Sequence, residues 1–116
     1  MKKIFHLGTC TTCQAIFKET DIDKKGFQMQ DIKLEKITSL QLEEMKKLAG
    51  SYEALFSRRA IKYREWNLKD KSLTEKEYRN CILEEYTFLK RPVVVINDNI
   101  FIGSEKNTIE ALKAVK

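Results

Sequence analysis

The sequence predicts a single α/β domain, residues 1–116, with the order β-α-β, a helical insert at about residues 38–89, and then β-β-α. Three observations predict this order. A short apolar strand leads into a Cys-x-x-Cys at a helix start, an alternating strand follows, and a valine run after the only proline leads into a hairpin. A chain of 116 residues is long enough for one compact domain and short for two.

The first half of this order consists of two strands flanking a helix. Residues 2–7 are predicted as the first strand, and a helix is expected from Cys10 through Thr20. Residues 23–26 form a turn, and residues 27–32 alternate apolar and polar side chains, which is typical of a strand. The right-handed crossover rule predicts that these two strands are parallel neighbours.

The insert reads as several helical pieces. Residues 38–41 have capping-box spacing ahead of an apolar pattern, so we expect a helix that ends near Gly50. Residues 72–75 are a second capping-box candidate, followed by apolar side chains at helical spacing. Cys81 lies in that apolar stripe and is expected to be buried and inert. The aromatic residues expected in the core are Tyr63, Trp66 and Phe88.

The last part begins after Pro92. Residues 93–96 are predicted as a fully buried strand, residues 97–99 as a turn, and residues 100–102 as the second arm of a hairpin. A last helix is expected from residues 103–104 onward. This is a thioredoxin-like order with an enlarged helical insert. In such sheets, sites lie at strand ends, where the cysteine loop and the segment before Pro92 are both expected.

Composition limits the function classes. No apolar run approaches a membrane-spanning length, and no signal-peptide core follows the first residues, so we expect a cytoplasmic protein that does not contact membranes. Three cysteines are an odd number, which argues against a structural disulfide framework. The net charge of +5 suits an anionic ligand or an acidic partner. Without a basic aromatic stripe or a known reader motif, no direct nucleic-acid binding is expected.

The Cys10–Cys13 motif carries the predicted chemistry. A cysteine at a helix N-terminus lies beside unpaired N–H groups that stabilise the thiolate, so Cys10 is the predicted nucleophile and Cys13 the resolving thiol. Two alternatives are small packing residues, or zinc ligands together with His6 and Cys81. Redox chemistry is favoured, and no metal or bound cofactor is predicted. Thr11 and Thr12, between the cysteines, are assigned to the binding surface.

Four further positions are candidates around that motif. His6, four residues before Cys10, could tune or deprotonate the thiol, or be an ordinary strand histidine. Arg91, before Pro92, could pair with the thiolate or grip an oxyanion if that proline is cis. Arg58 and Arg59 are weaker binding candidates, because adjacent arginines in a helical insert usually point into water.

Together these residues resemble the arsenate reductase (ArsC) family, including its Spx and YffB-like branches. The resemblance runs nearly end to end. Its most specific part is the Arg-Pro-Val-Val-Val segment at residues 91–95, in the context of the Cys-x-x-Cys. The segments that carry the resemblance are residues 4–13, 55–59, 63–65 and 89–95.

The resemblance implies a thioredoxin-like fold with a helical insert. It implies that Cys10 attacks a small oxyanion or thiol substrate, with Arg91 and His6 at matching family positions. It also implies glutathione, glutaredoxin or another thiol as the reductant. Ser57 and the neighbourhood of Gly103 lie where arsenate reductases have further anion-holding arginines. The intact Cys-x-x-Cys is more similar to Spx, which implies an alternative function: a redox-sensing regulator that binds the C-terminal domain of the RNA polymerase α subunit.

Overall fold

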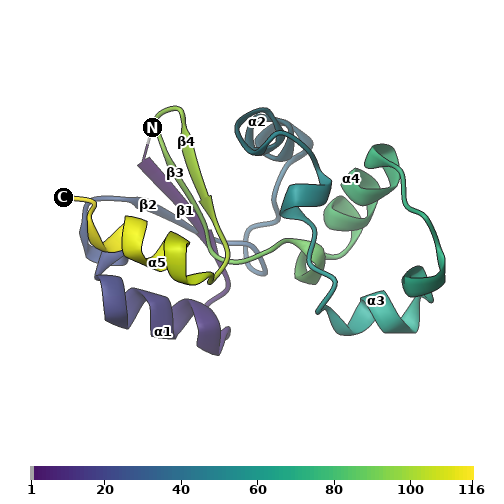
Figure 1. Cartoon of the computed structure of the whole chain (residues 1–116), viewed down its shortest axis with the longest axis horizontal. Coiled ribbons are helices and arrows are strands. Elements are labelled where there is room, and N and C mark those ends of the chain that lie inside the picture. Colours follow the sequence, from purple (N-terminus) through teal and green to yellow (C-terminus); the bar gives the residue numbers. More distant parts are fainter. Residues whose placement is uncertain (1) are drawn as a thin grey trace. The chain divides into compact units, whose positions relative to one another are not determined.

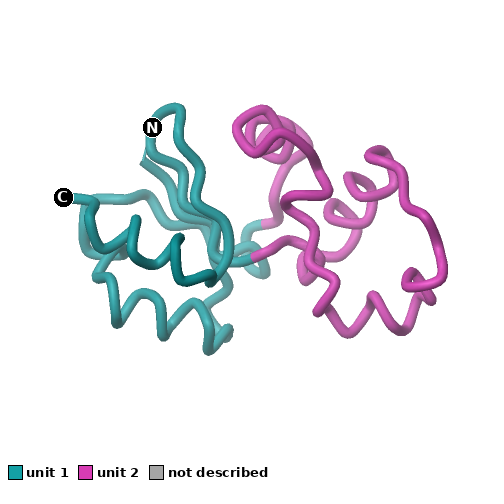
Figure 2. Tube along the Cα trace, in the orientation of Figure 1, with its two compact units in different colours: residues 1–35, 91–116 teal, residues 36–90 magenta. Residues whose placement is uncertain are grey.

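The computed structural model describes residues 2–116, which divide into two compact units. The first comprises residues 2–35 and 91–116, and the second comprises residues 36–90 (Figure 2). Whether the chain behaves as a single domain with an insert stays a prediction.

The first unit is a four-stranded mixed sheet with two helices (Figure 1). The sheet order is β2-β1-β3-β4, in which β1 and β2 are parallel while β1–β3 and β3–β4 are antiparallel. The parallel first pair and the C-terminal hairpin are both as predicted from the sequence. The elements are β1 (Lys2–His6), α1 (Thr11–Thr20), β2 (Gln28–Asp31), β3 (Val93–Ile96), β4 (Asn99–Ile102) and α5 (Lys106–Lys113), with a 3₁₀ turn, η1 (Ile22–Lys24).

One apolar core joins the sheet of this unit to its helices. Ile4 of β1 and Val94 of β3 are opposite each other in the sheet and are fully buried. Ile16 from α1 and Leu112 from α5 pack into the same cluster. Burying aliphatic side chains from four elements fixes the face on which both helices lie, at roughly 1.5–3 kcal/mol per fully buried side chain. The cysteine loop, residues 7–10, joins the end of β1 to the start of α1 and is thereby anchored at both ends.

The second unit is built from short helices. They are α2 (Ser39–Ala49), α3 (Ile61–Glu65) and α4 (Glu75–Glu84), with 3₁₀ turns η2 (Glu53–Leu55), η3 (Leu68–Asp70) and η4 (Tyr86–Phe88). Its core includes a stack of Phe56 on Phe88, with ring centroids 5.0 Å apart, and Tyr78 4.9 Å from Phe56. Phe88 is fully buried as predicted, whereas Tyr63 and Trp66 are only half-buried against these rings.

Two local predictions in the insert have different outcomes. The capping box at residues 38–41 is confirmed: the Thr38 side chain and Gln41 cap each other's backbone N–H at the start of α2, which ends at Gly50 with φ 98°. The capping box predicted at residues 72–75 is wrong. The cap is instead made by Thr74 and Glu77, because the Glu75 carboxylate accepts the backbone N–H groups of Tyr52 and Glu53.

The last helix and Cys81 also differ from expectation. Helix α5 begins at Lys106 rather than at residues 103–104, because Gly103 has φ 77° and its N–H donates to Pro92 O at 2.9 Å. Cys81 on α4 is half-buried rather than buried.

Candidate active site

The first cysteine lies where strand and helix meet. Cys10 is the N-cap of α1: its backbone is extended, its N–H donates to Leu7 O at 3.0 Å, and its carbonyl accepts the N–H of Gln14 at 3.1 Å. Cys10 therefore lies at the end of α1 where the first-turn N–H groups have no partner within the helix, and that turn contains no acidic residue. Both Cys10 and Cys13 are free thiols.

The Cys10 thiol is easier to ionise than an ordinary cysteine. Burial works against the thiolate. The hydrogen bond from the Cys13 backbone N–H and the one from the Arg91 guanidinium outweigh that burial, so the pKa of Cys10 lies below its usual value. The thiolate is the nucleophilic form, and of the two cysteines in the first unit Cys10 is the more readily ionised.

Sheet pairing explains why Arg91 lies near Cys10, which is 81 positions earlier in the sequence. Strands β1 and β3 are antiparallel, with Phe5 opposite Val93, so the end of β1 and the start of β3 lie at the same end of the sheet. Arg91 and the buried Pro92 directly precede β3, and the bond between them is cis. Arg91 therefore lies at the same end of the sheet as the cysteine loop, as the strand-end argument expects.

Cys13 has the opposite character. It is fully buried, one turn into α1. Burial raises the pKa of its thiol to about 11, and negative charge on Cys10 adds to the rise, although the Leu7 backbone N–H partly counteracts both. The two thiols thus differ strongly in acidity while lying within hydrogen-bonding reach of each other.

His6 lies on the β2 side of the cysteine loop. Its ring meets Phe17 edge-on, with centroids 5.7 Å apart, and it pairs in register with Asp31. The interactions that lower the pKa of Cys10 come from Cys13 and Arg91, with His6 acting instead on the Asp31 carboxyl. Thr11 and Thr12 are exposed first-turn residues of α1. The roles predicted for His6 and both threonines stay predictions.

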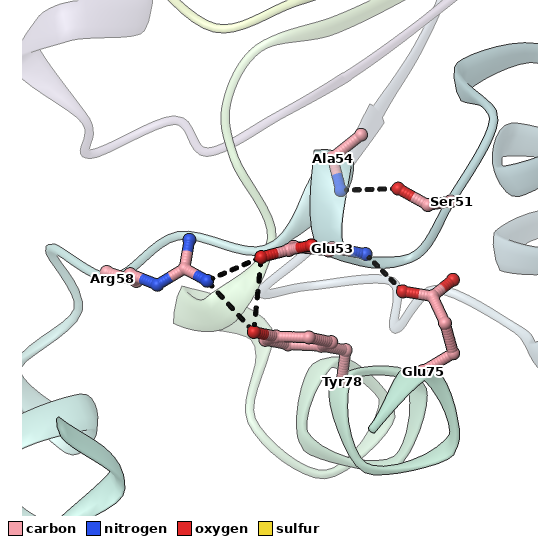
Figure 3. A network of polar contacts seen from close by, with 6 residues as sticks. All are labelled: Ser51, Glu53, Ala54, Arg58, Glu75 and Tyr78. Atoms are coloured by element: carbon pink, nitrogen blue, oxygen red, sulfur yellow. Dashed lines mark hydrogen bonds and ion pairs between the residues drawn. The ribbon is translucent and has the colours of Figure 1, made fainter. Parts of the chain in front are cut away.

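The two adjacent arginines belong to the second unit. The Arg58 guanidinium donates to Glu53 Oε2 at 2.8 Å and to the Tyr78 hydroxyl at 2.9 Å (Figure 3). The Arg59 side chain is exposed, and its backbone N–H donates to Ser57 Oγ at 3.3 Å. Arg58 is therefore bound within its own unit, while a binding role for either arginine stays a prediction.

Two residues that the sequence did not single out hold the cysteine loop. Asp31 Oδ2 accepts the Gly8 N–H at 3.0 Å, and Gln14 Nε2 donates to Gly8 O at 2.7 Å. A polar residue at a strand end is too common to have identified Asp31. Its contact with Gly8 depends on the parallel register that places His6 opposite Asp31.

Within residues 2–116, no group of three or more His, Cys, Asp or Glu side chains is arranged to hold a metal ion. Over that range, too, each helix is either too short or too polar to cross a bilayer.

Comparison with known proteins gives one family and a consistent fold. The ArsC family profile matches residues 5–112. No sequence among curated proteins matches the chain. Several solved structures do. An ArsC family related protein from Bacteroides fragilis is 23% identical, with a TM-score of 0.81 over 97% of both chains. An arsenate reductase from Vibrio cholerae is 17% identical, with a TM-score of 0.77 over 98% of this chain and 97% of that one. A protein from Staphylococcus aureus is 27% identical, with a TM-score of 0.72 over 96% and 97%. The structure thus has the thioredoxin-like fold of ArsC proteins, as predicted.

Proposed function

This chain belongs to the ArsC family, and we propose that it is a thiol–disulfide oxidoreductase in which Cys10 attacks and Cys13 resolves. The observation that carries the proposal is the asymmetry of the two thiols. Cys10 is half-buried and has a lowered pKa, whereas its neighbour Cys13 is buried and has a pKa of about 11. A partly exposed, readily ionised thiol beside a buried, protected one is the arrangement that a two-step exchange needs.

The Cys10 thiolate attacks one sulfur of a substrate disulfide, forming a mixed disulfide and releasing one substrate thiolate, which takes a proton from solvent. Cys13 then loses its proton and attacks the Cys10 sulfur, which releases the second substrate thiol and leaves a Cys10–Cys13 disulfide. The substrate gains two electrons and the protein loses two. A thiol reductant such as glutathione or glutaredoxin returns them.

The charge at Cys10 helps to order these steps. While Cys10 is a thiolate, its negative charge contributes to the raised pKa of Cys13, so the second thiol stays protonated. Formation of the mixed disulfide removes that charge and makes Cys13 easier to deprotonate. Arg91 is proposed to stabilise the Cys10 thiolate and, where the substrate is negatively charged, the substrate anion as well.

A disulfide is a better-supported substrate than arsenate. Gly103, near the position of a third anion-holding arginine in arsenate reductases, has φ 77°, a backbone that side-chain-bearing residues rarely adopt. Ser57 stands at the position of the middle one. One arginine at the sulfur suffices for a thiolate but supplies only part of the charge that a doubly charged oxyanion requires.

A single-turnover assay tests the proposal. Reduced protein is mixed with a small disulfide under anaerobic conditions, and the released thiol and the protein disulfide are quantified by mass spectrometry. For the wild type we expect two released thiols per chain and a Cys10–Cys13 disulfide. Cys10→Ser should release no thiol and form no disulfide, and Cys81→Ser should give the full yield of both. A full yield from Cys10→Ser would overturn the proposal. A parallel reaction with arsenate, glutathione and glutaredoxin measures the narrower activity, for which we expect far slower turnover.

The same cysteine pair supports a second candidate, redox-switched binding to the C-terminal domain of the RNA polymerase α subunit. What favours it is a disulfide-forming pair without a full set of anion-holding arginines. Gly50, in the region through which Spx contacts polymerase, is exposed, and nothing lies within 4 Å of where its Cβ would be. Its φ of 98° is also explained by the end of α2. A pull-down with that domain that shows no binding in either redox state would reject this candidate.

A further inference from the structure

Both backbone polar groups of Gly8 are held by side chains. Its N–H donates to Asp31 Oδ2 at 3.0 Å, and its carbonyl accepts from Gln14 Nε2 at 2.7 Å. Asp31 is itself fixed, because its Oδ1 accepts the Lys33 N–H at 2.9 Å while its backbone carbonyl accepts the N–H groups of Leu34 and Glu35 at 3.1 and 2.8 Å. The carboxylate therefore ties the loop after β1 to the turn after β2.

The segment held in this way contacts both cysteines. The Leu7 carbonyl accepts the Cys10 N–H at 3.0 Å. Burial raises the pKa of the Cys13 thiol, and the Leu7 backbone partly counteracts that rise. Leu7 is buried, and Gly8 follows it directly. A shift of Gly8 would thus move the Leu7 carbonyl and N–H, the backbone groups that orient Cys10 and stabilise charge on Cys13.

Gly8 is required for space rather than for its backbone conformation. Its φ lies outside the left-handed region that favours glycine. A Cβ built at residue 8 would lie 2.8 Å from Asp31 Oδ2, and the other atom within 4 Å is Asp31 Cγ. The Asp31 side chain is therefore the obstacle to a larger residue at position 8.

We propose that Asp31 is a positioning residue for the Cys10–Cys13 pair, which holds the Leu7–Gly8 segment in the register that aligns the backbone groups of the loop with both sulfurs. The proposal deepens the oxidoreductase function and rests on it. Asp31 neither touches the substrate nor exchanges electrons. It acts through the loop.

The sign of the effect separates positioning from simple electrostatics. The charged and titratable groups near the loop include the two thiols, Asp31, His6 opposite it in register, Arg91, and Lys33 and Glu35 in the turn after β2. If Asp31 acted only through its charge, its removal would favour both thiolates and lower the pKa of Cys10. If it positions the loop, its removal misaligns the Cys13 N–H and raises that pKa.

The first test measures the pKa of Cys10 in the full chain by pH-dependent alkylation, with each cysteine quantified separately by mass spectrometry. We expect Asp31→Ala to raise the pKa of Cys10 by about one pH unit. At a pH well below that pKa, the thiolate fraction then falls about tenfold. Asp31→Asn, which keeps one acceptor oxygen, should raise the pKa less. The control Asp98→Asn removes an exposed carboxylate and should change nothing. An unchanged or lowered pKa in Asp31→Ala would overturn the proposal.

The second test is a double-mutant cycle that stays informative if one variant folds poorly. Gly8→Ala should lower the urea midpoint of unfolding clearly in the wild-type background and much less in the Asp31→Ala background, because the obstructing carboxylate is gone. Equal losses in the two backgrounds would contradict the contact. The two proposals fail separately. An ordinary pKa of Cys10 in the wild type rejects the oxidoreductase function, whereas a lowered one that Asp31→Ala leaves unchanged rejects only the role of Asp31.

Discussion

Cys10 and Cys81 differ in acidity although neither is fully exposed nor fully buried. Cys10 caps α1 in the first unit, and Cys81 lies within α4 in the second. Burial disfavours both thiolates. At Cys10 the Cys13 N–H and Arg91 outweigh it, whereas at Cys81 the negative charges of Glu84 and Glu77 add to it, so the pKa of Cys81 is raised. Exposure alone is therefore a poor guide to reactivity. The position in the helix and the sign of the neighbouring charges decide it.

The arginines of the two units show a parallel difference. Arg91 donates to a sulfur at the start of a helix. Arg58 is bound to Glu53 and Tyr78, in a network whose neighbour Glu75 caps the backbone of η2 (Figure 3). Arg91 is thus the arginine for which a role at the sulfur is proposed, whereas Arg58 is held in a polar network of its own unit.

The largest expected effect comes from separating the two thiols of the site. In Cys13→Ser, attack by Cys10 on a disulfide should stop at the mixed disulfide, which accumulates to about one adduct per chain instead of passing on. Intact-protein mass spectrometry measures it, and the matched variant Cys81→Ser should accumulate none. Complete release of both substrate thiols by Cys13→Ser would show that Cys13 does not resolve the adduct.

An intermediate effect is expected from Arg91. Arg91→Ala removes a hydrogen bond and a positive charge from the Cys10 sulfur, so the pKa of Cys10 should rise and alkylation near neutral pH should slow by about tenfold. Arg91→Lys keeps the charge but lacks the planar guanidinium, so its alkylation rate should lie between those of the wild type and Arg91→Ala. Alkylation kinetics followed by mass spectrometry check this, with Arg59→Ala as the arginine control. Equal rates in Arg91→Ala and the wild type would contradict the assigned contact.

The smallest effect is expected in the second unit. Arg58→Ala breaks an ion pair whose side chains are 49% and 55% exposed, so the free energy of unfolding should fall by only about 1 kcal/mol or less. Urea unfolding followed by circular dichroism measures it. A loss several times larger would mean that this network contributes far more to folding than exposed ion pairs usually do.

Local signals were predictable from the sequence to different degrees. The Thr38–Gln41 box was identified because both partners lie within one turn. Ser72–Glu75 and Thr74–Glu77 have the same spacing, and the choice between them depends on Glu75 binding backbone groups 22 and 23 residues earlier. Local pattern reading cannot detect such a distant partner.

The site shows the same limit. Cys10 and Cys13 were identified by spacing at a strand-to-helix junction, and Arg91 by the strand-end argument and the family resemblance. The hydrogen bond from the Gly8 N–H to Asp31 depends on strand register, which follows from the packed sheet rather than from either segment alone.

The central claim is that Cys10 is held as a thiolate more readily than an ordinary cysteine. Competitive alkylation of Cys10 and Cys81 in one wild-type sample, followed by mass spectrometry from pH 5 to 10, tests it most directly. As the pH rises, Cys10 should become reactive first, because its pKa is lowered, and Cys81 later, because burial and the nearby carboxylates raise its pKa. Coincident profiles, or Cys81 reacting before Cys10, would contradict the account.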